Sequence, residues 1–464
     1  MTDTSGAALR SLSLWHASLP DDDTLAPRPA LPGDIDVDVA IVGGGYTGLW
    51  TAHYLIEADP TLRIAIIERR IAGFGASGRN GGWASAILPM SLDSMAHRHG
   101  RDAAIRMQRE MYNCVDEVGR AAASLGIDCH YAKGGQYEFV RNPAQEGRVR
   151  SWLATQESYG LGDPHWLGPD EASERAGASK MIGAMYTPHC AAIHPARLAR
   201  GLAASVEARG VRIYEQTTAS EIAPRRIVTD HGTVKATWVI RATEGFTATL
   251  KGEKRTLVPI YSLMIATEPL PADVLESVGL RERATFNDAR HLIIYGQRTA
   301  DGRLAFGGRG APYHFGSAIK PEFDRDAGVH AALHRTLVDI FPQIRDAAIT
   351  HRWGGALGLP RDWHCGVGLD RRTGMGYAGG YVGDGVTTTN LAGRTLADLV
   401  LGRASDITSL AWVGHRSRRW EPEPIRFLSI RTSLKLPAGA DRFEEKHQRS
   451  ERFRTFVLSK LTKH

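Results

Sequence analysis

Cysteine is scarce in this 464-residue sequence, and long apolar runs are missing from it. The four cysteines (Cys114, Cys129, Cys190 and Cys365) are widely spaced and form no CxxC pair. This spacing argues against a structural zinc site or a disulfide framework, and it fits free thiols in a reducing cytoplasm. No stretch approaches the roughly 20 consecutive apolar residues that a membrane-spanning helix requires. The first residues lack a basic start followed by an apolar run, so we expect neither a signal peptide nor an integral membrane segment.

The sequence also lacks the features of a nucleic-acid-binding protein, although its net charge is +6. The excess lies in residues 415–464, which hold 13 Lys and Arg against 6 Asp and Glu. These charges alternate in sign, and no aromatic side chains are interleaved to stack with bases. Phe453, Val457 and Leu461 are spaced as one apolar stripe of a terminal helix. We expect this helix to dock against the rest of the protein, and a membrane surface is the alternative.

The composition is that of a globular protein, and the chain is longer than one core needs. Apolar residues make up 42% and charged residues 23%. Single cores seldom exceed about 250 residues, so we expect two or three domains. Residues 1–34 are interpreted as a polar arm. Residues 36–42, 46–58 and 62–68 have the pattern of a strand, a helix and a strand, which predicts a βαβ unit.

Later segments predict two kinds of sheet. Between residues 255 and 312, short alternating strands are separated by turns, which favours an antiparallel sheet. The other expected elements are a helix over 196–209, strands over 211–214 and 237–242, a strand leading to a second glycine turn over 374–381, and a helix over 386–401. The chain is therefore expected to pass between a parallel-sheet domain and an antiparallel one.

The glycines of the βαβ unit form a dinucleotide-binding turn. Gly43, Gly45 and Gly48 make a GxGxxG motif between a predicted strand and a predicted helix, which is the context that gives the motif its value. Gly43 permits a tight turn, Gly45 lets the backbone approach a pyrophosphate, and Gly48 allows close helix–strand packing. Glu68 lies 20 residues after Gly48, at the end of the next strand, where a carboxylate can accept both ribose hydroxyls.

The next segment indicates FAD rather than NAD. Residues 73–82 (GFGASGRNGG) form a polar, glycine-dense loop, and such a loop lets backbone amides wrap a bulky cofactor closely. A simple NAD domain has no need for it.

At these residues the sequence resembles the D-amino acid oxidase (DAO) superfamily of flavoproteins. The nearest branch holds glycine oxidase, sarcosine oxidase and γ-glutamylputrescine oxidase. The resemblance rests on Glu68 followed by GASGRNGG, and on residues 192–198, 218–220, 242–245 and 378–386 in the family's order. Glu244 stands where the family usually has asparagine.

The resemblance implies a set of FAD-binding residues and no metal. The set is Gly43, Gly45, Tyr46, Thr47, Gly48, Glu68, Arg69, Ala76, Ser77, Arg79, Asn80, Gly81, Gly82, Ala219, Ala242, Thr243, Gly380, Gly383, Asp384, Gly385, Val386 and Thr387. The helix after the second glycine turn is expected to point its N-terminus at the flavin, where a positive dipole end stabilises the reduced form. No cysteine occupies the place used for covalent attachment, so we expect non-covalent FAD.

The resemblance also implies the architecture. The fold class is α/β, or α+β overall, with a Rossmann-like FAD-binding domain interleaved with an antiparallel-sheet substrate domain. We assign residues 35–86, 187–250 and 345–405 to the FAD-binding domain, and residues 87–186 and 251–344 to the substrate domain. Residues 1–34 are the arm, and residues 406–464 are a basic, helical C-terminal extension.

The chemistry implied is oxidation of a C–N bond in a small amine or amino acid. In this superfamily a hydride moves from the carbon beside a neutral amine to flavin N5, and the imine is hydrolysed. O2 or another acceptor then reoxidises the flavin. No dedicated base is needed, so we assign no certain catalytic residue.

Four residues are candidates for contacting the substrate: Tyr295, Arg309, Trp353 and Trp83. Tyr295 lies in a segment like the strand that presents a tyrosine over the flavin, and Arg309 has the chemistry to pair with a carboxylate. Sheet or core packing is the open alternative for each aromatic residue, and a structural role for Arg309. Ala356 stands near the place of the arginine that clamps the carboxylate in many members, which leaves room for an amine or polyamine derivative.

Three other functions remain as alternatives. A flavin monooxygenase would use NAD(P)H, but we find no convincing second fingerprint for it. A plain NAD dehydrogenase would leave residues 73–82 and the second glycine turn unexplained. A flavin-binding protein without turnover is distinguished by flavin that no amine reduces.

Overall fold

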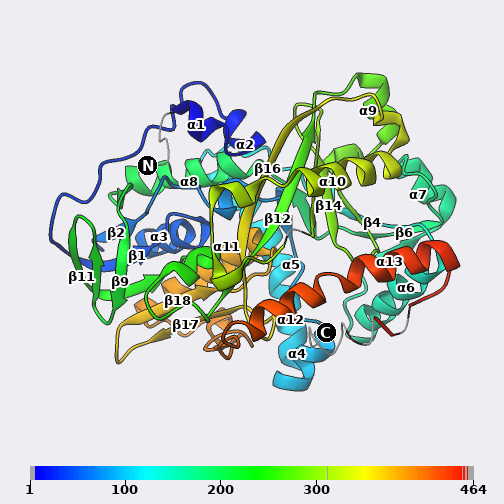
Figure 1. Ribbon diagram of the computed structural model, residues 1–464. Coiled ribbons are helices and arrows are strands. Elements are labelled where there is room, and N and C mark those ends of the chain that lie inside the picture. The colour runs from blue at the N-terminus through cyan, green and yellow to red at the C-terminus, as the bar shows by residue number, and fades with distance from the viewer. Residues whose placement is uncertain (1–5, 311, 452, 455–456, 458–464) are drawn as a thin grey trace.

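The computed structural model describes residues 6–310, 312–451, 453–454 and 457, and it contains two eight-stranded sheets that lie side by side (Figure 1). The first sheet, at the left of the view, consists of β1 (Ile35–Val42), β2 (Ile64–Ile67), β8 (Arg212–Tyr214), β9 (Ala219–Ala223), β10 (Arg226–Thr229), β11 (Gly232–Arg241), β17 (Gly366–Asp370) and β18 (Met375–Gly379). The second consists of β4 (Gln136–Val140), β5 (His165–Leu167), β6 (Gly183–Thr187), β12 (Val258–Thr267), β13 (Thr285–Asp288), β14 (Ile294–Arg298), β15 (Leu304–Arg309) and β16 (Ile349–Leu359). A mixed α/β fold with one mainly parallel and one mainly antiparallel sheet was predicted, and it is confirmed.

The first sheet has the order β17-β18-β11-β1-β2-β8, with β9 and β10 as a hairpin beside β11. β1 pairs in parallel with β2 and with β11, and β2 is buried along its whole length, as expected of a strand covered on both faces. One face packs against α3 (Tyr46–Ala58), α5 (Arg101–Ser124), α8 (Pro195–Ala208) and α11 (Gly385–Leu401). Ile227 of the hairpin and Leu31 of the arm belong to the cluster on the other face. The predicted βαβ unit is thus present as β1-α3-β2.

The second sheet has the order β16-β12-β15-β14-β13-β4-β6-β5, and its pairs are antiparallel except for β13 with β4. One face packs against α7 (Pro169–Arg175), α9 (Ala272–Val278) and α10 (Ala327–Ile340). The other face is turned toward the loop over residues 73–82, as the contacts of Tyr295 and Gln297 below establish. A short sheet of β3 (Trp83–Ser85) and β7 (Cys190–Ala192) lies next to that loop. α4 (Leu92–His99) and α6 (Pro143–Ser158) complete the body.

Two segments lie in a different body from the one we assigned. β16 falls inside residues 345–405, which we placed in the FAD-binding domain, yet it pairs with β12 in the antiparallel sheet. All ten residues of β12 are buried, so this strand needs a partner on each side, and β16 is the second. α5 falls inside residues 87–186, which we placed in the substrate domain, yet Met111 and Val115 pack in the core shared with α3 and α11. The remaining domain boundaries stay a proposal.

The N-terminal arm is not simply polar. It contains α1 (Gly6–Arg10) and α2 (Leu14–Ala17), and Leu14, Trp15 and Leu25 are at most 2% exposed. These side chains pack with Met264 and Trp353 of the antiparallel sheet. Our interpretation of a polar arm was therefore wrong, because the charged residues around Asp21–Asp23 hid a short apolar segment.

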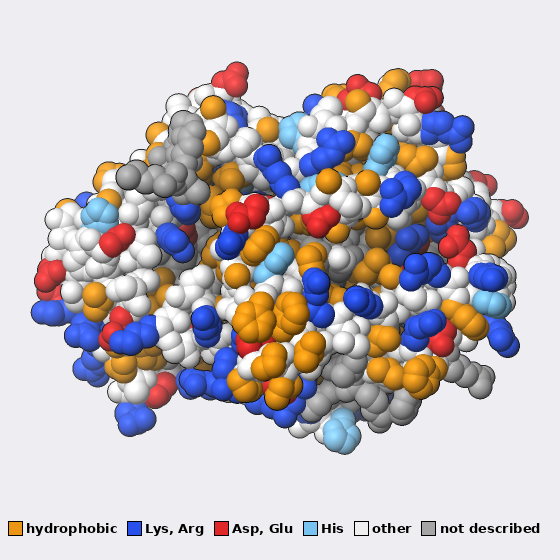
Figure 2. All heavy atoms as spheres, in the orientation of Figure 1, with side chains coloured by type: hydrophobic (Ala, Val, Ile, Leu, Met, Phe, Trp, Pro, Cys, Tyr) orange, Lys and Arg blue, Asp and Glu red, His pale blue; other side chains and the backbone are white. Residues whose placement is uncertain are grey.

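The C-terminal extension runs across the antiparallel-sheet body as α12 (Ile425–Ser433) and α13 (Leu436–His447), drawn in red in Figure 1. Of the three residues of the predicted docking stripe, Phe453 is 73% exposed and Val457 is half-buried. Leu461 lies outside the described residues. Figure 2 shows hydrophobic side chains gathered over α12, where Ile425 and Leu428 are 56% and 61% exposed. Within the described part of the chain, none of the helices has the length and apolar character to cross a bilayer.

Candidate functional site

The first glycine turn, between β1 and α3, has no room for side chains. A Cβ on Gly43 would lie 2.4 Å from the Ala242 carbonyl oxygen, and a Cβ on Gly48 would lie 2.1 Å from that of Gly43. Gly43 also has a φ of 115°, which disfavours any other residue. α3 begins at Tyr46 with Gly45 as its N-cap, and Gly45 has no side chain to cap the helix. This helix N-terminus, with its positive dipole end, suits a pyrophosphate.

Glu68 stands beside this turn at the end of β2, as predicted. Its carboxylate accepts hydrogen bonds from the backbone N–H groups of Gly44 and Arg70, each at 2.8 Å. Burial raises the pKa of Glu68, and these two hydrogen bonds oppose the rise. Ser77 accepts from Tyr46 N at 2.9 Å, so the loop closes over the helix start. A half-buried carboxylate can accept from the ribose hydroxyls of an adenosine, and the N–H groups at the helix N-terminus beside it can donate to the pyrophosphate.

The second glycine turn meets the first directly. Thr47 Oγ1 lies 2.9 Å from the Tyr381 hydroxyl, although the two residues are 334 positions apart. α11 begins just after this turn at Gly385, and its N-cap Asp384 makes no side-chain cap. A Cβ on Gly393 would lie 2.6 Å from Trp50 Cβ, so α3 and α11 pack in close contact. The two predicted glycine motifs therefore form one site.

Glu244 joins the second turn to the antiparallel sheet. Its carboxylate accepts from Gly380 N at 2.8 Å and from Gly358 N of β16 at 3.2 Å. Burial raises the pKa of Glu244 to about 7, against the effect of these hydrogen bonds. The departure from the family's asparagine thus places a carboxylate where the turn and β16 are held together.

The other predicted cofactor residues fall into three groups. Ala242, Val386 and Thr387 are buried, Ala219 and Thr243 are half-buried, and Arg69 is exposed. Gly380 and Gly383 have φ values of 79° and 105°, as tight turns require. Ala76, Gly81 and Gly82 lie in or next to the loop over residues 73–82. The individual roles of these residues in cofactor binding remain predictions.

The N-terminal arm donates hydrogen bonds to the loop over residues 73–82, a contact that we did not predict from the sequence. Trp15 Nε1 donates to the Asn80 carbonyl oxygen at 2.8 Å, and Ser13 Oγ donates to the Gly78 carbonyl oxygen at 3.0 Å. His16 Nδ1 lies 2.8 Å from Ser13 Oγ, and burial lowers the pKa of His16 to about 3, so the ring is neutral. The single sequence signal for this support is a tryptophan among leucines in a segment that otherwise reads as polar.

The side chains of Arg79 and Trp353 make hydrogen bonds inside the protein. Arg79 Nε donates to the Phe74 carbonyl oxygen at 2.8 Å, and Nη1 pairs with Asp324 Oδ2 at 2.7 Å. Trp353 is 1% exposed, and its Nε1 donates to the Arg79 carbonyl oxygen at 2.9 Å. This burial favours the packing alternative for Trp353, because a side chain so enclosed has no surface left for a substrate.

Tyr295 lies against the loop, and Trp83 lies beside it. A Cβ on Gly81 would be 2.6 Å from Tyr295 Cε2, and the Tyr295 hydroxyl is 2.7 Å from Ser262 Oγ. Trp83 Nε1 donates to the Gly296 carbonyl oxygen at 3.1 Å, and its ring meets the Tyr295 ring edge-on. Both aromatic residues are half-buried, so each retains some exposed surface.

Two glutamine side chains lie on the same face of the second sheet as Tyr295. Gln297 Nε2 donates to the carbonyl oxygens of Gly81 and Gly82 at 2.8 and 3.1 Å. Gln136 Nε2 donates to Asn287 Oδ1 at 3.0 Å on the same face. We did not name these residues from the sequence, although alternation with apolar neighbours in each strand was a usable signal.

Two expectations concerned a carboxylate clamp, one at Arg309 and one near Ala356. The side chain of Arg309 lies outside the described part of the structure, so its predicted role is not tested. Ala356 packs with Tyr261 in the cluster on the helix-covered face, away from the loop. The residue of β16 that faces the loop is Gly355, where a Cβ would be 3.7 Å from Arg79 Cδ. The absence of an arginine at either position still leaves this side of the site without a clamp from β16.

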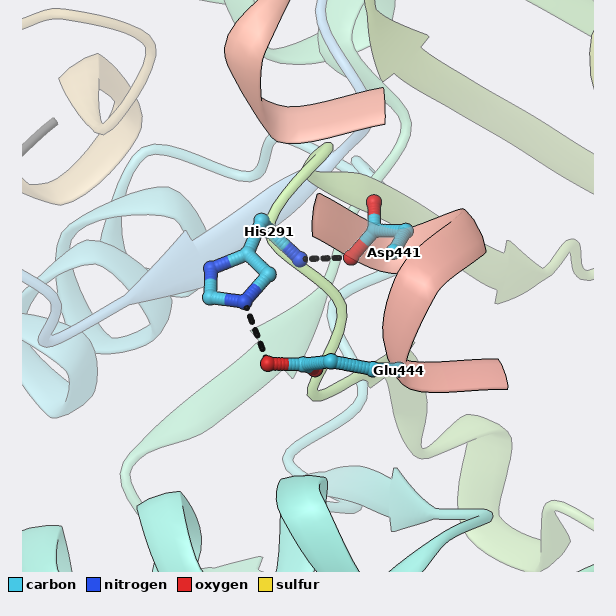
Figure 3. Close-up of side chains that lie close together, drawn as sticks. All are labelled: His291, Asp441 and Glu444. Atoms are coloured by element: carbon cyan, nitrogen blue, oxygen red, sulfur yellow. Dashed lines mark hydrogen bonds and ion pairs between the residues drawn. The ribbon is translucent and has the colours of Figure 1, made fainter. Parts of the chain in front are cut away.

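His291, Asp441 and Glu444 lie together where α13 meets the loop before β14 (Figure 3). Asp441 accepts from the backbone N–H groups of His291 and Leu292 at 2.7 and 2.9 Å. Glu444 lies 3.0 Å from His291 Nε2 and pairs with Arg148 through both oxygens, which holds the pKa of Glu444 at about 2 despite its burial. These groups are satisfied by each other and by Arg148, so the cluster attaches α13 to the substrate side of the molecule.

A dinucleotide turn, a second glycine turn beside it and an antiparallel sheet facing both define a flavin-dependent oxidoreductase. The chain belongs to the DAO family of FAD-dependent oxidoreductases, whose model matches residues 38–399. FAD is its cofactor, and the chain is of the amine and amino-acid oxidase type.

Two curated relatives cover most of the chain. One is the γ-glutamylputrescine oxidoreductase of Escherichia coli (strain K12), 31% identical over 401 residues, which are 84% of this chain and 89% of the relative. Another is a probable oxidoreductase OrdL of Rhizobium meliloti (strain 1021), 30% identical over 413 residues, or 86% and 90% of the two chains. The glycine oxidase of Geobacillus kaustophilus has a TM-score of 0.66 at 23% identity and covers 82% of this chain and 99% of its own, which shows a shared fold.

Proposed function

We propose that the protein oxidises the C–N bond of a small amine, in preference to a plain α-amino acid. The carrying observation is the half-buried Tyr295, which lies on the loop at Gly81 with its hydroxyl 2.7 Å from Ser262 Oγ. FAD would supply the chemistry, by accepting a hydride at N5 from the carbon beside the amine, and the imine would be hydrolysed in water. Tyr295 and Ser262 would orient the amine, and Gly355 and Ala356 offer no side chain to clamp an α-carboxylate.

The cellular location of the protein and the mode of its FAD binding belong to the same proposal. All four cysteines are buried free thiols, which supports a reducing cytoplasm. Burial raises the pKa values of Cys190 and Cys365 to about 12, so neither is poised as a thiolate for attachment. We therefore propose non-covalent FAD, and acid precipitation should release it completely into the supernatant.

The test is anaerobic reduction of the purified holoenzyme with a panel of amines and amino acids. The panel spans sarcosine, glycine, D-amino acids, polyamines and γ-glutamyl amines, and loss of the flavin band near about 450 nm reports reduction. Rapid return of the colour on admitting air identifies an oxidase, and slow return indicates another electron acceptor. Reduction by NAD(P)H but by no amine would contradict the proposal and favour a monooxygenase.

A further inference from the structure

In each of three neighbouring strands, one side chain is partly exposed on the face of the sheet that lies toward the loop over residues 73–82, which we call the flavin loop. This residue is Glu138 in β4, Asn287 in β13 and Tyr295 in β14. Arg298, at the end of β14, is also partly exposed. The other residues of these strands are buried. These partly exposed positions form a row on one face of the sheet, and the row begins at the proposed substrate-orienting tyrosine.

The strand register places these residues in one row. Asn287 pairs with Glu138 across β13 and β4. Thr285 and Phe286 pair with Gln297 and Gly296 across β13 and β14, and the same register brings Asn287 beside Tyr295. Strands lie about 4.8 Å apart, so Glu138 is about 10 Å from Tyr295 across the sheet. Glu138 therefore stands at the end of the row that is remote from the loop.

The carboxylate of Glu138 lacks a hydrogen-bond or ion-pair partner in the described part of the chain. Among the residues that the structure describes, no donor or cation is within hydrogen-bond or ion-pair distance of it, and the charges that act on it are Asp288 and Arg148. Asp288 is paired with Arg290 at 2.6 Å. Arg148 is held by both oxygens of Glu444 at 2.9 and 3.0 Å. Burial, and then Asp288, raise the pKa of Glu138 to about 7, which shows how poorly its charge is compensated.

An uncompensated carboxylate inside a protein is costly, and it is retained where a ligand supplies the missing charge. We propose that Glu138 binds a second cationic group of the substrate, at the end of the site away from the flavin. The substrate class is then an amine that carries another ammonium group along its chain, as diamines and polyamines do. This inference rests on the proposed amine oxidation, and it adds the residue that selects among amines.

The test compares diamines with monoamines of equal chain length. Putrescine and n-butylamine form one pair, and cadaverine and n-pentylamine form the other. The dissociation constant and the limiting rate of anaerobic flavin reduction are measured for the wild type and for Glu138→Gln. A hydrogen bond to a charged group contributes enough to predict a 10- to 100-fold weaker dissociation constant for each diamine, and less than about a twofold change for each monoamine. The limiting rate should stay unchanged, because Glu138 is remote from the reacting carbon.

Controls separate binding from folding. Glu138→Asp keeps the charge and should recover part of the diamine affinity. Glu174→Gln removes an exposed carboxylate on α7, on the opposite side of the sheet, and should change nothing. The FAD dissociation constant of Glu138→Gln, followed by flavin fluorescence, should equal that of the wild type.

The outcomes distinguish this inference from the function on which it rests. If no amine reduces the wild-type flavin or perturbs its absorption, the proposed function fails and the inference with it. If amines reduce the flavin but the wild type binds diamines and monoamines equally, or Glu138→Gln weakens both alike, only the role of Glu138 is overturned. In that case Glu138 is a neutral acid in the wall of the site.

Discussion

The ion pair between Arg79 and Asp324 connects the flavin loop to the antiparallel-sheet body. Replacing either partner should therefore destabilise the folded protein. The Arg79 side chain is 6% exposed and that of Asp324 is 23% exposed, and their N–O distance is 2.7 Å. Burial raises the pKa of Asp324, so its charge depends on the guanidinium beside it. Removing Arg79 leaves a carboxylate with little water to replace its partner.

The magnitude follows from that burial. Breaking a buried pair by removing one partner costs about 3–5 kcal/mol. Since Asp324 keeps some contact with water, we expect about 3 kcal/mol for Arg79→Met. Asp324→Asn should cost less, about 1–2 kcal/mol, because Arg79 keeps its hydrogen bond to the Phe74 carbonyl oxygen. The double variant should cost less than the sum of the two by more than about 1 kcal/mol.

The assay is urea unfolding at fixed excess FAD, because bound cofactor adds to the measured stability by mass action. The matched control is the pair of Arg63 and Asp38, which has a similar distance of 2.8 Å but side chains that are 62% and 34% exposed. Removing either control partner should cost less than about 1 kcal/mol. Additive losses at Arg79 and Asp324, or losses no larger than in the control pair, would refute the reasoning.

Three further predictions concern the cofactor site. The pKa of Glu244 is raised from 4.5 to about 7, so its contribution to stability is present below about pH 4.5 and is lost as the pH rises through 7. Across that window the free energy of unfolding of the wild type, measured at each pH, should fall by at most about 3 kcal/mol relative to that of Glu244→Gln. Gly48→Ala places a Cβ 2.1 Å from the Gly43 carbonyl oxygen, so FAD binding measured by fluorescence should weaken at least about 100-fold, and binding within about threefold of wild type would contradict the backbone clash. Trp15→Phe removes the donor to the Asn80 carbonyl oxygen, and we expect about 1 kcal/mol of lost stability and a shifted flavin spectrum; an unchanged spectrum would limit the arm to packing.

Elements that are specified locally were predictable from the sequence. The strand over residues 36–42, the glycines at 43, 45 and 48 and the helix over 46–58 each follow from neighbouring residues, and the structure has β1 and α3 at nearly the same bounds. Glu68 was predictable for the same reason, because the end of the next strand in a βαβ unit lies beside the first turn.

Elements that depend on distant partners were not predictable in this way. We predicted no strand over residues 349–359, and only the need of β12 for a second partner explains why they join the antiparallel sheet. The arm failed for a related reason, since Leu14 and Trp15 gain their burial from Met264 and Trp353, which lie more than half the chain away. Local polarity around Asp21 gave no sign of that contact.

The two halves of the site differ in the same respect. The cofactor half is read from glycines, because a phosphate needs backbone N–H groups and open space, and both leave a local mark in the sequence. The substrate half is set by register: Glu138 and Tyr295 lie in one row on the same face of the sheet only because β4, β13 and β14 pair in that order. A single carboxylate in an alternating strand is an ordinary sequence pattern. Only the arrangement of the neighbouring strands shows that Glu138 has no counter-charge among the described residues. Differences in substrate choice among proteins of this fold should therefore be sought at such cross-strand positions and not in the glycine motifs.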